Sequence, residues 1–185
     1  IGGIFEVIAI NALPGLGSFI QSTEKLDAKL AAAIIAIQGV KAIEFGAGFY
    51  AAKLSGSKFH DAFDIKNNQI IRTSNNAGGI EAGMTNGMPI VLRAFMKPIP
   101  TLLAPLQSVD LQTFKIDKAI VERSDVCVVP AAGVVAEAAV ARVLTAAILT
   151  DFGRDNIKFI LNRYTAKKNF IKKKYKVKLN ALDLF

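Results

Sequence analysis

Residues 74–101 read S-N-N-A-G-G-I-E-A-G-M-T-N-G-M-P-I-V-L-R-A-F-M-K-P-I-P-T, and this stretch decides how the rest of the chain is interpreted. Four glycines fall within ten residues: Gly78, Gly79, Gly83 and Gly87. Glycines at this density cost conformational entropy unless the backbone must adopt positive φ or pass close to another group. The pattern therefore favours a turn in which backbone amides are free to meet a ligand, with a plain structural turn as the alternative.

The residues after these glycines predict a strand that ends in a rigid, positively charged loop. The apolar, β-branched run 90–92 opens a strand expected to reach Met96, and Lys97 then leads into Pro98-Ile99-Pro100. Proline fixes φ, so the lysine is held on a stiff segment. This arrangement favours an anion-binding site in which backbone amides and one ammonium converge on the anion, most simply a phosphate.

Composition places the whole chain among globular proteins. It has 185 residues, of which 52 % are hydrophobic and 21 % charged, enough for one domain with a sizeable core. A single cysteine, Cys127, excludes an internal disulfide framework and fits a reducing compartment. One histidine and no clustered cysteines argue against a zinc site, and we expect no metal.

The net charge of +8 belongs to the end of the chain. Between Arg154 and Lys178 there are ten Lys or Arg and one acid, Asp155, whereas the remainder has thirteen basic and fourteen acidic residues. We therefore divide the chain into a body, 1–153, and a basic amphipathic helical tail, 154–185. One face of that helix should carry the apolar residues Ile157, Ile160, Leu161, Tyr164, Ile171 and Tyr175. A surface helix that docks on its apolar stripe and leaves a solvated basic face is favoured over a nucleic-acid or membrane-binding arm.

Hydrophobic periodicity predicts an α+β fold. We expect a helix that begins near an N-cap at Ser22 or Thr23, buries Leu26, Leu30, Ala33, Ile34 and Ile37, and ends at Gln38-Gly39. A second helix over 134–150 is apolar nearly all round, which implies burial between layers, and Pro130, Glu137 and Arg142 argue against a membrane span. A helix over 49–54 is possible by pattern, and 55–68, with the lone His60, is expected to be irregular and solvated. Strands are expected at 4–10, 40–45, 69–73 and 90–96, with short ones at 109–111 and 118–122.

Arg123 and Asp125 are candidates for chemistry, at the junction between a strand and the second helix. An arginine there can hold a phosphate or carboxylate with its two-pronged fork, and an aspartate can stay ionised or accept a proton from a ligand. An ion pair that only fixes the loop is an equal alternative. The sequence holds no Ser-His-Asp pattern, Walker-type G-K-S or G-x-G-x-x-G fingerprint.

Several motifs, in order, resemble the C-terminal half of chorismate synthase. The resemblance runs from Gly2 to about Phe152 and rests on L-P-G-L-G (13–17), K-L-D-A-K-L (25–30), G-V-K-A-I-E-F-G (39–46), N-N-A-G-G-I-E-A-G-M-T-N-G (75–87), K-P-I-P-T (97–101) and R-S-D-V-C-V-V-P (123–130). It implies a β-α-β sandwich, with antiparallel sheets layered against helices, assembled as a homotetramer. It also implies a lyase that converts 5-enolpyruvylshikimate 3-phosphate to chorismate and phosphate by 1,4-anti elimination.

The resemblance implies reduced FMN as the cofactor, kept reduced by a flavin reductase or by an NADP-linked activity of the protein itself. It assigns flavin contacts to Gln38, Gly39, Ala82, Lys97, Pro98, Ile99, Pro100, Thr101 and Arg123. Asp125 matches the acid placed by the flavin ring to assist proton transfer, and Arg123 could equally bind the substrate's anionic groups. A cytoplasmic protein with no nucleic-acid or membrane partner is expected. A non-catalytic phosphate- or nucleic-acid-binding module that uses the glycine stretch and the basic tail is the alternative, and a structural remnant that assembles without binding a ligand is a third.

Some positions depart from the commoner family pattern. Gln38-Gly39 stands where Asn-Ala is common, which affects a side-chain contact, and Ser124 replaces a histidine between Arg123 and Asp125. Ala82 stands where glycine is usual, and we expect a backbone contact there to survive if φ stays negative. The chain opens on Ile1 within a strand-like run, so we expect it to be part of a longer polypeptide whose N-terminal half supplies the family's histidines and further arginines.

Overall fold

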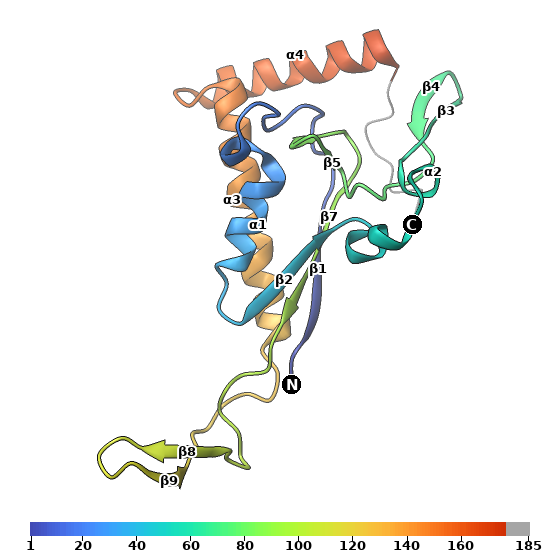
Figure 1. The fold of residues 1–185 in the computed structure, drawn as a ribbon. Coiled ribbons are helices and arrows are strands. Elements are labelled where there is room, and N and C mark those ends of the chain that lie inside the picture. Colours follow the sequence, from blue (N-terminus) through green and yellow to red (C-terminus); the bar gives the residue numbers. More distant parts are fainter. Residues whose placement is uncertain (177–185) are drawn as a thin grey trace.

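The computed structural model describes residues 1–176 and shows an antiparallel sheet with helices packed on one face (Figure 1). Its central sheet has three strands in the order β1-β7-β2, which are Gly3–Ala9, Ile90–Met96 and Val40–Phe45. Both outer strands pair antiparallel with β7, Phe5 opposite Ala94 and Ile43 opposite Ala94. The β-branched and apolar composition that predicted these three strands is confirmed.

A layer of two helices, α1 (Leu26–Ile35) and α3 (Val129–Phe152), covers one face of this sheet (Figure 1). Leu26, Leu30 and Ile34 of α1 are fully buried, as their helical spacing predicted, and they share a core with Leu92 of β7. α3 contributes small residues at four-residue spacing, Ala132, Ala136 and Val140, so its backbone can lie close to the sheet. This packing confirms an α+β fold with an antiparallel sheet layered against helices.

The start of the first helix differs from the expectation. Ser22 and Thr23 lie in a 3₁₀ turn, η1 (Ser22–Glu24), and α1 begins only at Leu26 without a side-chain cap. The prediction of a Ser or Thr N-cap was therefore wrong. Glu24, which was expected in the first turn of the helix, lies in η1 and pairs with Lys29 of α1.

The prediction that α3 is buried between two layers was also wrong for the described residues. Only 17 % of the residues in its most apolar 18-residue stretch are buried, and Val134 and Val135 are 68 % and 54 % exposed. By length and composition alone α3 could cross a membrane. One face nevertheless packs on β1 and α1, which is the behaviour of a core helix whose second face lacks a cover among residues 1–176. The second sheet of the predicted sandwich is not among these residues.

The opposite face of the central sheet carries a row of charges across all three strands. Arg93 on β7 lies directly between Glu6 on β1 and Glu44 on β2. Its guanidinium Nε is 2.9 Å from the Glu44 carboxylate and 3.8 Å from that of Glu6. Cross-strand pairs of opposite charge stabilise the register in which they meet.

Three small hairpins and two short helices complete the body. The hairpins are β3–β4 (Phe63–Lys66 and Gln69–Arg72), β5–β6 (Ile80–Glu81 and Met84–Thr85) and β8–β9 (Gln107–Asp110 and Lys115–Lys118); the short helices are η2 (Gly48–Lys53) and α2 (Gly56–Phe59). The irregular segment predicted over 55–68 was therefore wrong, because it contains α2 and β3. The short strand expected at 109–111 overlaps β8 at Val109 and Asp110, whereas the one expected at 118–122 was wrong except at Lys118, the last residue of β9.

α4 (Ile157–Tyr175) crosses the end of α3 at the top of the molecule (Figure 1). Ile160 is buried with Leu13, Leu16 and Phe152, in a cluster that Tyr164 and Ile171 flank. The predicted apolar face is correct at these three α4 positions and wrong at Ile157, Leu161 and Tyr175, which are about half exposed or more. Residues 177–185 of the predicted tail, including Lys178, lie outside the described residues.

Candidate functional site

One group of predicted site residues meets where the central strand β7 ends. The Lys97 backbone N–H, the first after β7, donates to the Gly39 carbonyl at 2.9 Å. Gly39 has φ +86°, and a Cβ there would lie 2.9 Å from Met96 Cε. The turn that ends α1 thus favours glycine for its conformation, whereas an added Cβ would meet only the movable end of the Met96 side chain.

The loop that follows keeps its charged group available. Lys97 is exposed, and the hydrogen bond of its ammonium among the described residues goes to the neighbouring Pro98 carbonyl at 3.0 Å. Pro98 itself lies against the N-terminal strand, because a Cβ on Gly2 would be 3.0 Å from its ring. The two prolines and this contact hold a cation on a stiff loop, as the sequence predicted.

The segment with Arg123 and Asp125 returns to the same end of the sheet. The Ile1 nitrogen donates to the Val126 carbonyl at 2.7 Å, and Gly3 faces Val129. Pro98 and Val126 therefore both lie against residues 1–3. Arg123 and Asp125 are exposed, and no ion pair involving either forms within residues 1–176. The alternative of an ion pair that fixes the loop is thus wrong for the described structure.

We refer to Gln38, Gly39, Lys97 to Thr101, Arg123 and Asp125 as the sheet-end cluster. Lys97 directly follows β7, and Arg123 and Asp125 come three residues and one residue before Val126, which contacts Ile1 at the same end of the sheet; all three charged side chains are exposed. Gln38 is exposed beside Gly39, and Ile99 and Thr101 are half-buried. Such a set can bind anionic oxygens and hold a proton acceptor near them.

The glycine stretch has a different role from the one predicted. Its backbone amides do converge on an anion, but that anion is the protein's own carboxylate, Asp61. The buried Asp61 accepts from Ser74 Oγ at 2.5 Å, Asn76 N at 2.7 Å and Ala77 N at 3.0 Å. Lys97 does not join them, because it lies at the far end of β7, roughly 20 Å away at about 3.3 Å per strand residue. The predicted phosphate cradle of amides and Lys97 is therefore wrong.

Sequence reasoning missed Asp61. It stands in a polar stretch beside His60, and no spacing or motif links it to the glycines that it organises. His60 is exposed and lies edge-on against Phe59, in agreement with the expectation of a solvated residue.

Ala82 lies apart from the sheet-end cluster. With Gly83 it forms the two-residue turn between β5 and β6, with φ values of +50° and +80°. The expectation that φ of Ala82 stays negative is wrong. The turn needs two residues in the left-handed conformation, and Ala82 adopts the conformation of the glycine that is usual at this position. Ala82 lines a cavity of about 440 Å³ together with Phe45, Phe59, His60, Asp61 and Asn76, among others.

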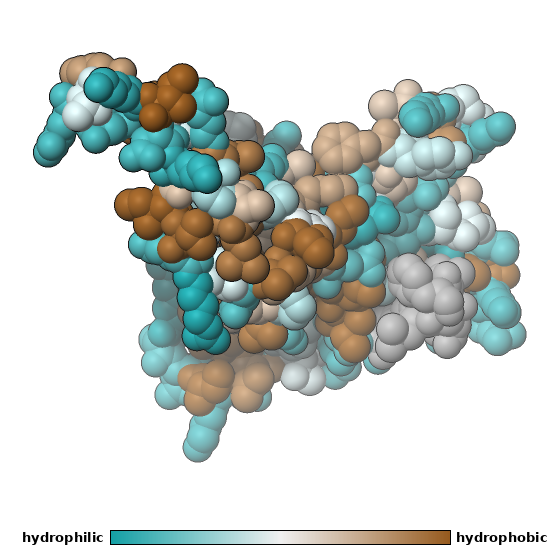
Figure 2. Space-filling view, turned by 90° about the horizontal axis from the view of Figure 1, so that it is seen from below, coloured by the Kyte–Doolittle hydropathy of each residue, from teal (hydrophilic) through white to brown (hydrophobic). Residues whose placement is uncertain are grey.

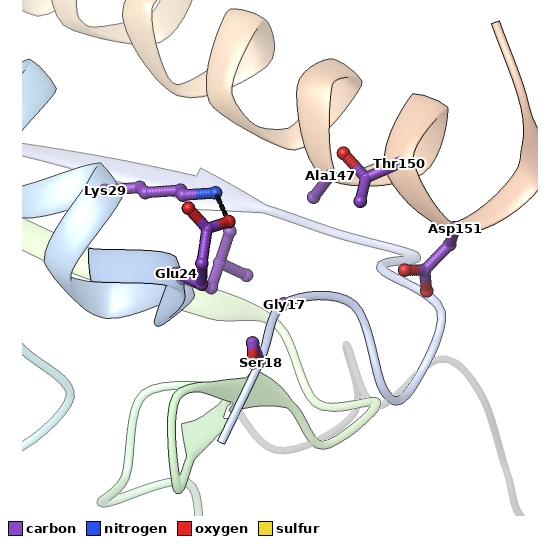
Figure 3. A pocket seen from close by; sticks show the side chains of 8 residues that line it. Gly17, Ser18, Glu24, Lys29, Ala147, Thr150 and Asp151 are labelled. Atoms are coloured by element: carbon purple, nitrogen blue, oxygen red, sulfur yellow. Dashed lines mark hydrogen bonds and ion pairs between the residues drawn. The ribbon is translucent and has the colours of Figure 1, made fainter. Parts of the chain in front are cut away.

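A second cavity, of about 290 Å³, opens between the 17–18 loop, α1 and the end of α3 (Figure 3). Lys29 and Glu24 pair with each other on the α1 side of this cavity, while Thr150 and Asp151 lie on the α3 side. Asp151 pairs with Lys167 at 3.4 Å. The charged side chains that line this second cavity are thus paired within the chain, and none of the predicted site residues lines it.

Comparison with known proteins gives one consistent result. A sequence model of the family described as "Chorismate synthase" matches residues 1–149. The chain is 51 % identical over 172 residues to the chorismate synthase of Geobacter sulfurreducens, and 51 % identical over 173 residues to "Chorismate synthase 2" of Bacillus thuringiensis. These alignments cover 89 % and 93 % of this chain but 44 % of each relative.

The fold agrees. A crystal structure of chorismate synthase superposes with a TM-score of 0.76 at 40 % identity, over 93 % of this chain and 44 % of the other. The chain thus spans less than half the length of the relatives it matches. Because the family match covers most of the 185 residues and the fold agrees with it, the chain belongs to the chorismate synthase family.

Proposed function

We propose that this chain is the part of a chorismate synthase polypeptide that supplies one wall of the flavin and substrate site. The activity proposed for the full polypeptide is the 1,4-anti elimination of phosphate from 5-enolpyruvylshikimate 3-phosphate, which gives chorismate. The observation that carries the proposal is the sheet-end cluster. Lys97 of this cluster directly follows the central strand, its side chain is exposed, and its backbone N–H donates a hydrogen bond to the Gly39 carbonyl.

The residues of the cluster suit reduced FMN. Lys97 and Arg123 are exposed cations, and the Gly39 carbonyl accepts the hydrogen bond of the Lys97 amide at the end of β7. When bound, reduced FMN would lend electron density to the substrate while phosphate leaves. Lys97 to Thr101 and Gln38-Gly39 would hold and orient this cofactor, and the backbone at Ala82 would be a more distant neighbour whose assignment rests on the family resemblance alone.

Arg123 and Asp125 have complementary roles in the proposal. The Arg123 guanidinium binds flavin or the anionic groups of the substrate through charge-assisted hydrogen bonds. The Asp125 carboxylate, two residues on and exposed, accepts or relays the proton that is removed from the substrate. The remaining walls would come from the part of the polypeptide that this chain does not span.

The partners proposed for the full polypeptide follow the same reasoning. We propose a homotetramer, with reduced flavin maintained by a reductase or by an NADP-linked activity of the protein, in the cytoplasm. Because the chain spans 44 % of its relatives, we expect the 185-residue chain alone to form no chorismate. Normal turnover by this chain with reduced FMN would refute that expectation.

FMN titration of the full-length polypeptide, with 5-enolpyruvylshikimate 3-phosphate present, tests the site. Lys97→Ala should weaken FMN binding at least tenfold, because an exposed charge-assisted contact is lost. Lys66→Ala is the matched control, since Lys66 is an exposed lysine on β3, outside the sheet-end cluster. Equal affinities of the two variants would contradict the proposal.

The alternative binding module makes the opposite prediction. Removing Lys167 to Lys178 should abolish binding of a phosphate polymer in that case, and should leave FMN binding largely intact in the enzyme. The structure weighs against the glycine stretch as a phosphate site, because the backbone amides of Asn76 and Ala77 already donate hydrogen bonds to the Asp61 carboxylate. Absence of FMN binding in the presence of substrate would favour a remnant that assembles without a ligand.

A further inference from the structure

The start of β1 contacts both of the chain segments that carry the charged groups of the sheet-end cluster. On one side, the Ile1 nitrogen donates to the Val126 carbonyl at 2.7 Å, and Gly3 lies beside Val129 at the start of α3. On the other side, Gly2 lies against the loop that follows β7. One short piece of backbone therefore separates the two segments and sets how far apart they stand.

The space around Gly2 is closed by backbone atoms. A Cβ on Gly2 would lie 2.4 Å from the Met96 carbonyl oxygen and 3.0 Å from the Pro98 ring. Gly2 is not one of the glycines with positive φ, so alanine could adopt its conformation and only space forbids the side chain. The Met96 carbonyl shares a planar peptide unit with the Lys97 N–H, which donates to the Gly39 carbonyl at 2.9 Å. Gly2 and Gly39 thus hold this peptide unit from opposite sides.

The space around Gly3 is limited by one side chain. A Cβ on Gly3 would lie 3.2 Å from Cγ2 of Val129, whereas carbon atoms pack best at about 3.5–4.0 Å. The Cγ1 and Cβ atoms of the same valine would follow at 3.7 and 3.8 Å. A methyl group at Gly3 would therefore push Val129 away from β1, and with it the chain that leads back to Asp125 and Arg123.

This end of the sheet presents a surface of mixed polarity. Figure 1 places the N-terminus at the lower end of the central sheet, and Figure 2 shows the molecule from below, where hydrophobic patches lie among hydrophilic residues. Small-molecule sites combine apolar contacts with a few polar groups at fixed positions, and a flavin has both an apolar ring and a charged phosphate. The distance between the two charged segments therefore matters for such a ligand.

We propose that Gly2 and Gly3 are positioning residues for the flavin and substrate site, an inference that rests on the proposed function. Neither residue touches a ligand in this proposal; each acts by lacking the Cβ that would push the two segments apart. A methyl group at Gly2 would move the Met96 carbonyl from 2.4 Å to at least 3.0 Å, and the Lys97 loop with it. A misplacement of about 1 Å can cost roughly a hundredfold in rate, so a shift of this size is large enough to measure.

The first test adds one methyl group to the full-length polypeptide. With 5-enolpyruvylshikimate 3-phosphate present, Gly2→Ala should raise the dissociation constant of FMN about tenfold or more. Without ligand, hydrogen-exchange mass spectrometry should show the Lys97 amide exchanging about tenfold faster, because its bond to Gly39 is weakened. Gly133→Ala is the matched control and should stay within about twofold, since a Cβ there would meet its nearest atom, Phe5 Cβ, at 3.8 Å.

The second test uses a rescue. Gly3→Ala should lower the rate of chorismate formation at saturating substrate about tenfold or more, because the Asp125 carboxylate is displaced, with a smaller effect on FMN affinity. Val129→Ala removes both Cγ atoms and leaves the Val129 Cβ at 3.8 Å. The Gly3→Ala, Val129→Ala double variant should therefore return to within about threefold of Val129→Ala alone. Val129→Ala should not rescue Gly2→Ala.

Circular dichroism melting shows whether each variant is folded, and if Gly2→Ala fails to fold, the rescue of Gly3→Ala decides alone. The proposal is overturned if Gly2→Ala and Gly3→Ala match Gly133→Ala in Lys97 exchange, FMN affinity and turnover. It is also overturned if Val129→Ala fails to restore Gly3→Ala. A parent that binds no FMN would instead refute the proposed function, and the exchange rates would still decide whether Gly2 positions the Lys97 loop.

Discussion

Replacing Asp61 by alanine should destabilise the protein strongly, although the residue belongs to no recognisable motif. Asp61 is 7 % exposed, and its carboxylate accepts three hydrogen bonds, two of them from the backbone amides of Asn76 and Ala77. A hydrogen bond to a charged group is worth about 1.5–3 kcal/mol, and a buried donor left unpaired costs about 1–3 kcal/mol. Since removing the carboxylate also removes the cost of burying it, we expect a net loss of about 3 kcal/mol in the free energy of unfolding.

Urea unfolding of the full-length polypeptide, followed by circular dichroism, measures this loss. At a slope of about 2 kcal/mol per molar urea, the midpoint should fall by about 1.5 M with the slope unchanged. Asp64→Ala is the matched control, because the exposed Asp64 carboxylate accepts from the adjacent Ile65 amide, and its loss should cost below about 0.5 kcal/mol. A midpoint for Asp61→Ala equal to that of the control would show that the glycine stretch holds its shape without this carboxylate.

Three other predictions follow from the geometry. Ala82→Gly should raise the free energy of unfolding by about 0.5–1 kcal/mol in the same urea assay, because φ is +50° there and glycine avoids the left-handed penalty; a loss of stability would argue against the two-residue turn. Leu92→Ala should lower it by about 2–5 kcal/mol, since Leu92 is fully buried on the central strand, whereas a change at the 87 % exposed Leu103 should cost far less in dilute protein. Hydrogen bonds from the amides of Thr113 and Gln112 lower the pKa of Asp110 below its ordinary value of 3.8. The hairpin turn should therefore be stabilised above that pH and loosen as the pH falls below it. Hydrogen exchange of these two amides would detect this pH dependence, and Asp110→Asn should remove it.

Local patterns predicted the central sheet and α1 because burial follows sequence periodicity there. Leu26, Leu30 and Ile34 recur at helical spacing, and the run 90–96 is apolar enough to be the middle strand. The same approach failed for α3, because an apolar helix is interpreted as buried on all sides, whereas the described residues cover only its face toward β1 and α1. It failed again for 55–68, where tertiary contacts fix short elements that have little intrinsic preference.

Part of the candidate site was also predicted, where its structure depends on local sequence signals. Proline and glycine signals correctly predicted the stiff loop after Met96 and the turn at Gly39, since both are local constraints. The partner of the glycine stretch could not be predicted, because Asp61 meets it only after the chain folds back over more than ten residues. Family resemblance supplied roles for Arg123 and Asp125 that no local pattern could assign.

The strand order β1-β7-β2 has a consequence for synthesis of the chain on the ribosome. β7 lies between two strands that are made long before it, and the Arg93 guanidinium meets Glu6 and Glu44 only when all three are present. At about 5–20 residues per second, β1 waits roughly 4–17 s for its partner strand to be translated. During that interval β1 and β2 each present unpaired backbone edges in the nascent chain, which is when this fold is most exposed to wrong strand pairing and most open to chaperones.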